Sequence, residues 1–132
     1  MFDHISLAVS NFEKSKAFYT QALAPIGHSK VAAIMVDGGR KPSAGFCHDD
    51  GSDLWISQGD PTRPLHIAFR VMSRSAVDAF HAAALAAGGR DNGGPGMRQQ
   101  YHPNYYAAYV LDPDGHNIEA VCHDALGAAE SS

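Results

Sequence analysis

Few of the features that mark the more specialised classes of protein are present in this chain of 132 residues. It contains only two cysteines, Cys47 and Cys122, which lie far apart and form no Cys-x-x-Cys pair. Each is therefore expected to be a free thiol that packs as a small hydrophobic side chain, as in a reducing compartment. The chain also lacks a Gly-x-Ser-x-Gly elbow and a phosphate-binding loop, so neither chemistry is indicated.

Basic residues and long apolar runs are also scarce. Lysine and arginine number 10 against 14 aspartate and glutamate, a formal net charge of −4, which provides no basic surface for nucleic acid. The first residues lead directly into a strand without a basic stretch, a long apolar core or a cleavage site. We therefore expect no membrane partner and a cytoplasmic protein.

What the sequence does contain is an internal repeat. Residues 3–9 and 65–71 are two copies of one strand, with His4 and His66 at the same place and 62 positions apart. Residues 50–56 match residues 114–120 in the same way, at an offset of 64. A repeat of this length predicts two structural modules rather than a solenoid. Because units of about 60 residues are marginal alone, the two modules are expected to pack into one domain.

The first module is expected over about residues 2–60, the second over 63–123, and a tail over 124–132. In the first, alternation and turn residues predict a strand at 2–9, a helix that begins at Ser10-Asn11 and ends near 24, and strands at 28–36, 43–48 and 53–58, with turns at 37–39 and 49–51. In the second they predict a strand at 65–72, a helix at 74–87, a glycine-rich loop at 88–96, and strands near 97–101, at 105–111 and at 117–122. The fold class is therefore α+β, with two tandem βαβββ modules.

These features together resemble the vicinal oxygen chelate superfamily, which includes glyoxalase I, extradiol dioxygenases, fosfomycin-resistance thiol transferases and bleomycin-resistance proteins. The resemblance rests on the repeated βαβββ order, on a histidine near the start of each first strand, and on Asp-Pro-Asp-Gly-His-Asn-Ile-Glu at residues 112–119. It covers about residues 2–123. It implies a cupped mixed sheet with a divalent metal ion on its concave face.

Carried onto this chain, the resemblance makes His4, His66 and Glu119 the metal ligands. Residue chemistry agrees, because two imidazoles and a carboxylate leave coordination positions open and suit iron, manganese, zinc, nickel or cobalt better than calcium. Glu119 lies in a strand that should be half buried, where a carboxylate is costly unless it is paired or bound to metal. The alternative interpretation is that the histidines are ordinary hydrogen-bonded strand residues.

Several other residues are candidates to line the cup and contact substrate. Alternation places Ser6 on the side of His4, and Arg70 on the side of His66. Trp55 occupies the register that matches Glu119, and because an indole cannot ligate a metal, this favours a site with three protein ligands. Trp55 itself is a candidate to stack on substrate or, equally, a core aromatic residue.

A second group of candidates lies just before the strand at 105–111. Arg98 is a candidate to hold a carboxylate or phosphate, His102 or Tyr101 to act as acid or base, and Tyr106 to contact substrate. The alternative is that the tyrosines pack in the sheet and Arg98 is a solvated charge.

The resemblance implies a metal-dependent enzyme that chelates adjacent oxygens of a small organic substrate, with lyase, isomerase, transferase and dioxygenase chemistry all left open. The alternative is a metal-free protein of the bleomycin-resistance type, which binds an aromatic or cationic ligand in the cup. Relatives with two modules are usually homodimers. We therefore expect a homodimer, with each site formed either within one chain or across two.

Overall fold

The computed structural model describes residues 3–48, 51–61 and 63–125. The expected turn at residues 49–51 lies partly outside these ranges, and the expected tail lies outside them from residue 126 onward. No helix within the described ranges is long enough and apolar enough to cross a membrane.

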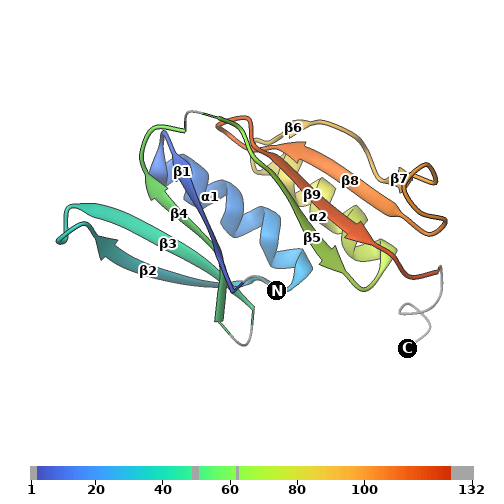
Figure 1. Ribbon diagram of the computed structural model, residues 1–132, viewed down its shortest axis with the longest axis horizontal. Coiled ribbons are helices and arrows are strands. Elements are labelled where there is room, and N and C mark those ends of the chain that lie inside the picture. Colours follow the sequence, from blue (N-terminus) through green and yellow to red (C-terminus); the bar gives the residue numbers. More distant parts are fainter. Residues whose placement is uncertain (1–2, 49–50, 62, 126–132) are drawn as a thin grey trace.

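The first module forms a four-stranded sheet with one helix (Figure 1). Its elements are β1 (Ile5–Val9), α1 (Phe12–Leu23), a short 3-10 helix η1 (Ala24–Ile26), β2 (Lys30–Val36), β3 (Lys41–His48) and β4 (Gly51–Gln58). The strand order is β1-β4-β3-β2, with β1 and β4 parallel and the other pairs antiparallel. Asn11 caps α1 by accepting a hydrogen bond from the Lys14 amide, as expected.

The second module repeats this layout in a separate five-stranded sheet. Its elements are β5 (His66–Val71), α2 (Arg74–Ala86), β6 (Arg90–Asp91), β7 (Gly96–Met97), β8 (Tyr106–Leu111) and β9 (Asn117–Cys122). The order is β5-β9-β8-β6, with β5 and β9 parallel and β7 also paired with β8. The predicted α+β class with two tandem modules is therefore confirmed.

One predicted element is wrong. In place of a strand near 97–101, the structure has two short strands, β6 inside the expected loop and β7, while residues 99–101 form a turn. Glycines and a proline at 93–96 interrupt the pairing with β8, and Gly93 adopts a φ of 144°, which is unfavourable for other residues. Alternation alone did not reveal this break.

The core lies between the sheets and the two helices, which lie behind the sheets in Figure 1. Alternation along each strand sends one set of side chains toward the helices and leaves the other set on the open face. In β1, Leu7 and Val9 are buried while Ser6 and Ala8 are exposed. Cys122 belongs to the core and Cys47 is partly buried, and in the described part of the chain neither forms a disulfide.

The turn at residues 112–115 joins the two modules. The Asp114 carboxylate accepts hydrogen bonds from the Ser10 amide at 3.2 Å and from the Ser10 hydroxyl. The buried Asp112 carboxylate accepts a hydrogen bond from the Tyr19 hydroxyl at 2.5 Å. Burial and the neighbouring Asp112 raise the pKa of Tyr19 well above its usual range, so this hydroxyl stays protonated.

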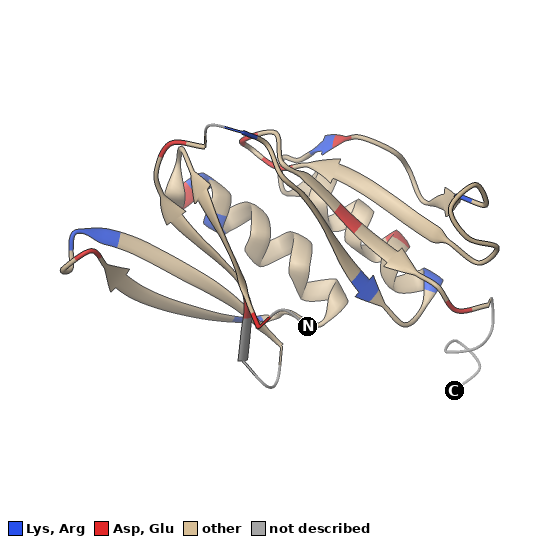
Figure 2. Ribbon diagram, in the orientation of Figure 1, with Lys and Arg blue, Asp and Glu red and all other residues tan. Residues whose placement is uncertain are grey.

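Charged residues are spread thinly over both modules. Figure 2 shows basic and acidic segments interspersed over strands, helices and loops, without a continuous basic stripe in the described part of the chain. The expectation that nucleic acid is not a partner stays a prediction.

Candidate functional site

Two of the three predicted ligands meet on the open face of the second sheet. His66 is the first residue of β5 and pairs with Asn117 of the neighbouring strand β9. Glu119 lies two residues after Asn117, on the same face of the sheet. The His66 Nε2 and Glu119 Oε1 atoms are 2.8 Å apart, so the imidazole donates a hydrogen bond to the carboxylate. The side chain of His66 is 54 % exposed whereas that of Glu119 is 1 % exposed, so the imidazole covers a buried carboxylate.

The second carboxylate oxygen of Glu119 has its own partner. The Tyr105 hydroxyl donates a hydrogen bond to Glu119 Oε2. Burial raises the pKa of Tyr105, and the hydrogen bond to Glu119 raises it further. Tyr109 pairs with Glu119 across the β8–β9 ladder, and its pKa is raised by burial and then by the Glu119 charge. Both phenols therefore remain hydrogen-bond donors at neutral pH.

These side chains line a cavity of about 470 Å³, which is the size of a small-ligand site. Its lining residues are His66, Tyr101, Tyr105, Tyr109, Asn117 and Glu119. Three phenol rings and one imidazole give it aromatic walls, and Glu119 is its one negative charge. Such a cavity suits a small organic molecule that carries oxygen atoms.

His4 does not join this pair within the chain. In Figure 1, β1 and β5 begin at opposite ends of the seam, the line along which the two modules meet. His4 directly precedes β1 and His66 is the first residue of β5, so the two histidines are held apart. His4 instead lines a second cavity of about 310 Å³, together with Asp3, Ile5, His28, Asp53, Leu54, Ile67, Ala68, Phe69 and Arg70. Within residues 3–48, 51–61 and 63–125, no three histidine, cysteine or acidic side chains are grouped closely enough to hold a metal ion.

His4 nevertheless has the local arrangement of a metal ligand. Its Nδ1 donates a hydrogen bond to Asp3 Oδ1 at 2.6 Å, and its side chain is 53 % exposed. Histidines that bind metals usually donate their other ring N–H to a carboxylate in this way, which fixes the tautomer. The Nε2 atom of His4 is thus left as the nitrogen available for a metal ion.

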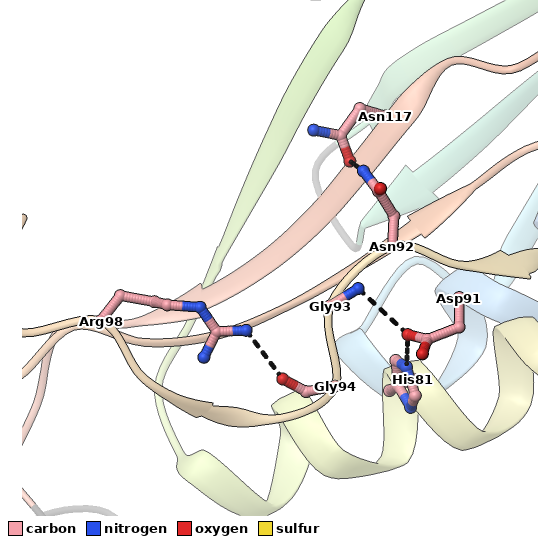
Figure 3. A network of polar contacts seen from close by, with 7 residues as sticks. All are labelled: His81, Asp91, Asn92, Gly93, Gly94, Arg98 and Asn117. Carbon is pink, nitrogen blue, oxygen red and sulfur yellow. Dashed lines mark hydrogen bonds and ion pairs between the residues drawn. The ribbon is translucent and has the colours of Figure 1, made fainter.

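Arg98 is directed away from the tyrosine-lined cavity. Figure 3 shows its guanidinium reaching back to the Gly94 carbonyl, with an Nη2 to oxygen distance of 2.9 Å. The guanidinium also lies 5.4 Å from the centre of the Tyr109 ring. Nearby in the same view, Asn92 donates to Asn117 at 3.2 Å, so this loop is tied to the first residue of β9. Arg98 thus supports the wall of the cavity rather than lining it.

The same loop is anchored on helix α2. His81 Nε2 lies 2.9 Å from Asp91 Oδ1, and that oxygen also accepts a hydrogen bond from the Gly93 amide at 3.0 Å (Figure 3). Hydrogen bonding to His81 and then to Gly93 lowers the pKa of Asp91, which stays ionised. His81 therefore has a structural partner outside the cavity.

The structure places the candidates from the segment before β8 in different environments. Tyr101, a candidate acid or base, is 65 % exposed and lines the cavity. His102 does not line it; its Nδ1 accepts a hydrogen bond from the Asn104 amide and its ring packs against His123. Tyr106 lies on the opposite face of the sheet, where it donates a hydrogen bond to Asp78 of α2. Burial and that bond raise the pKa of Tyr106 to about 12.

The candidates from the first strands lie outside the tyrosine-lined cavity. Arg70 lines the cavity of His4, and Ser6 lines a third cavity of about 250 Å³ at the other end of the seam. Trp55 pairs with Ser6 of β1 on one side and Gly45 of β3 on the other. Its neighbours Leu54 and Ile56 are buried in the core, so alternation places Trp55 on the open face of the first sheet. Its position matches that of Glu119, which pairs with Ala68 of β5 in the second sheet.

Three cavity residues were not selected from the sequence: Tyr105, Tyr109 and Asn117. Alternation contained the signal, because Tyr109 of β8 and Tyr105, the residue just before β8, share one side, and Asn117 shares the side of Glu119 in β9. What alternation could not tell is which side of β8 faces the carboxylate. The β8–β9 register, which pairs Tyr109 with Glu119, supplies that information.

The residues present suit part of a transition-metal site. An imidazole nitrogen and a carboxylate oxygen converge at 2.8 Å, and these donor types fit iron, manganese, zinc, nickel or cobalt. Burial of an unpaired carboxylate is costly, but both oxygens of Glu119 have hydrogen-bond partners, which offset that cost. One chain thus offers two converging donors, and His4 has a free nitrogen elsewhere on its surface.

Comparison with known proteins gives a consistent family. The family model described as Glyoxalase/Bleomycin resistance protein/Dioxygenase superfamily matches residues 1–120. A metallothiol transferase FosB from Shouchella clausii (strain KSM-K16) is 30% identical over 120 residues, which cover 89% of this chain and 76% of that protein. The resemblance inferred from the repeat and from residues 112–119 is thereby confirmed.

Solved structures show the same fold. A glyoxalase/bleomycin resistance protein from Albidiferax ferrireducens T118 superposes with a TM-score of 0.76 at 29% identity, covering 92% of this chain and 98% of that one. A mutant fosfomycin resistance protein FosX from Listeria monocytogenes, in complex with Mn(II) and 1S,2S-dihydroxypropylphosphonic acid, gives a TM-score of 0.64 at 23% identity, covering 96% and 92% of the two chains. The second likeness supports the fold alone.

Proposed function

The chain belongs to the Glyoxalase/Bleomycin resistance protein/Dioxygenase superfamily, and on that premise we propose that it is an enzyme that uses a divalent metal ion to act on a small organic substrate with adjacent oxygens. His66 and Glu119 hold the ion, and His4 of a second copy completes the site. The observation that carries the proposal is the buried carboxylate of Glu119, 1 % exposed, with the Nε2 of His66 2.8 Å from one of its oxygens.

The positions of the histidines support the proposal of a homodimer. His66 and Glu119 converge in one cavity while His4 of the same chain lines another, so one chain supplies two donors to the first cavity. Two imidazoles and a carboxylate form a set that leaves positions open for substrate. A second copy that brings its His4 against the second module supplies the missing imidazole.

The chemistry follows from the donor set and the walls. A divalent ion in this position supplies Lewis-acid stabilisation of negative charge on a substrate oxygen, an effect worth several kcal/mol. The Tyr109 side chain lines the cavity with its hydroxyl protonated, and the exposed Tyr101 supplies a further ring against the substrate. The relative FosB, named a metallothiol transferase, makes thiol transfer one reaction to test first on this chain.

A second candidate function is metal-free binding of a small aromatic or cationic ligand. It is favoured by the three tyrosines around the buried carboxylate, an arrangement that attracts cations and planar rings. It predicts tight ligand binding that is unaffected by a chelator. The metal-dependent function predicts that the chelator removes an ion and weakens binding.

Metal content of the purified protein tests the proposal. Protein prepared without chelator and without an affinity metal is expected to contain about one transition-metal ion per chain, because buried carboxylate and imidazole donors favour such ions. Glu119→Gln and His66→Asn remove a donor each and are expected to abolish binding. Glu13→Gln, which changes an exposed carboxylate in α1, is the matched control and is expected to bind as wild type does.

The result that contradicts the proposal is equally definite. If wild-type protein contains no metal and takes up none when iron, manganese, zinc, nickel or cobalt is supplied, the metal-dependent function is wrong. Retention of the ion by folded Glu119→Gln would place the site elsewhere in the chain.

A further inference from the structure

Tyr105 is the residue that holds the second oxygen of Glu119. Its hydroxyl donates to Glu119 Oε2, while His66 Nε2 donates to Oε1 at 2.8 Å. The two carboxylate oxygens are therefore divided between two partners. Oε1 lies beside the imidazole, and Oε2 is turned toward the phenol.

The ring of Tyr105 is fixed by the segment before β8. The main-chain carbonyl of Tyr105 accepts a hydrogen bond from the Arg98 amide at 2.7 Å, and the main-chain amide of Tyr105 donates one to the His102 carbonyl at 3.1 Å. The ring also meets the rings of Tyr101 and His123 edge-on, with centroids 5.2 Å and 5.1 Å away. Contacts with two neighbouring rings leave the Tyr105 hydroxyl little freedom to leave Glu119.

We propose that Tyr105 is a positioning residue for the metal site: by holding Oε2, it presents Oε1 next to His66 Nε2 as the oxygen that binds the ion. This inference rests on the proposed function. Groups that orient a carboxylate ligand in this way commonly contribute strongly to metal affinity, because the ligand otherwise samples orientations that do not bind. Tyr105 acts through Glu119 and needs no contact with the ion or the substrate.

The test compares three proteins in a titration with Mn²⁺, followed by the electron paramagnetic resonance signal of the free ion. Tyr105→Phe keeps the ring and removes the hydroxyl, and it is expected to weaken Mn²⁺ binding about 10- to 100-fold relative to wild type. Tyr106→Phe is the matched control, because Tyr106 is the next residue and its hydroxyl bonds to Asp78 on the opposite face of the sheet. Its affinity for Mn²⁺ is expected to equal that of wild type.

A spectroscopic measurement separates positioning from a general loss of structure. Co²⁺ bound to Tyr105→Phe is expected to show a changed visible spectrum, since the carboxylate is free to bind through a different oxygen or through both. Tyr106→Phe is expected to give the wild-type spectrum. Should Tyr105→Phe fail to fold, as judged by circular dichroism, Tyr105→Leu provides a second side chain without the hydroxyl.

The outcomes distinguish this inference from the proposed function. If wild type binds Mn²⁺ and Tyr105→Phe binds it equally well with an unchanged Co²⁺ spectrum, the role of Tyr105 is overturned and the metal-dependent function stands. If wild type binds neither ion, the proposed function is overturned, and the positioning role with it.

Discussion

At the scale of single residues, Glu119 is the side chain that most needs an explanation. It is 1 % exposed in a strand whose neighbours Ile118 and Ala120 belong to the core. A carboxylate in such a place costs several kcal/mol unless its oxygens are satisfied. His66 and Tyr105 satisfy one oxygen each, and both face a cavity. The site is therefore built around a charge that the fold keeps away from water.

How much of this could be predicted from the sequence depends on the residue. His66 and Glu119 were named together by the family resemblance, and the repeat and the unusual carboxylate in a half-buried strand supported them. The position of His4 could not be predicted, since the repeat places it on a strand without saying where the two strands begin relative to each other. Tyr106 was selected in place of its neighbour Tyr105 because only the β8–β9 register shows which side of β8 faces Glu119.

Tyr19 carries a prediction at this scale. Its buried hydroxyl bonds to Asp112, so Tyr19→Phe is expected to lower the free energy of unfolding by about 1–3 kcal/mol at neutral pH. The pKa of folded Tyr19 is raised above its unfolded value of about 10, so its stabilisation is present below pH 10 and lost as the pH rises above that value. Urea unfolding at a series of alkaline pH values checks both effects.

The phenylalanine variant is expected to lose less stability than wild type as the pH rises past about 10, because one group that ionises on unfolding is gone. Some dependence of stability on pH is expected to remain in this variant, because the pKa values of three other tyrosines are also raised: Tyr105, Tyr106 and Tyr109. Identical pH curves for the two proteins would show that Tyr19 does not contribute through its ionisation.

At the scale of elements, the sequence predicted the two modules well and the connection after α2 poorly. Strands with clean alternation, such as β1, and helices with a cap, such as α2 with Ser73, were found within a few residues of their observed ends. Between α2 and β8, the glycines at 93, 94 and 96 leave the backbone free to adopt many conformations. Its observed conformation is set by pairing with β8 and by a hydrogen bond to Asp91, not by a local sequence pattern. Tertiary contacts, which a local pattern does not contain, decide such a segment.

The end of α2 carries the prediction at this scale. A methyl group on Gly89 would lie 2.5 Å from Val110 Cγ1 and 2.6 Å from Phe18 Cε1, and both residues are fully buried. Gly89→Ala is therefore expected to destabilise the protein by about 1–3 kcal/mol or more through overpacking. Gly94→Ala is the matched control, since its methyl group would meet nothing within 4 Å.

Thermal and urea unfolding of the two alanine variants measure the difference. The control is expected to stay within about 0.5 kcal/mol of wild type, as is usual for an exposed substitution. Equal stability of Gly89→Ala and Gly94→Ala would mean that the junction of α2, α1 and β8 is less tightly packed than the structure indicates.

At the scale of the whole molecule, the arrangement of the modules determines where a metal site can form. The modules are held together by the turn at residues 112–115, which bonds to Ser10 and Tyr19 of the first module. Their first strands begin at opposite ends of the seam, which separates the matched histidines of one chain. The proposed function therefore predicts a homodimer in which each site takes His66 and Glu119 from one copy and His4 from the other.

A mixed dimer tests whether the metal site is shared between two copies. His4→Ala and Glu119→Ala chains, carrying different affinity tags that do not bind metal, are co-expressed, the mixed dimer is isolated, and its metal content is measured. Each variant alone is expected to bind no metal. The mixed dimer is expected to bind about one ion, because the intact His4 of one chain meets the intact His66 and Glu119 of the other. A mixed dimer without metal, from a wild type that binds it, would contradict a site shared between two copies.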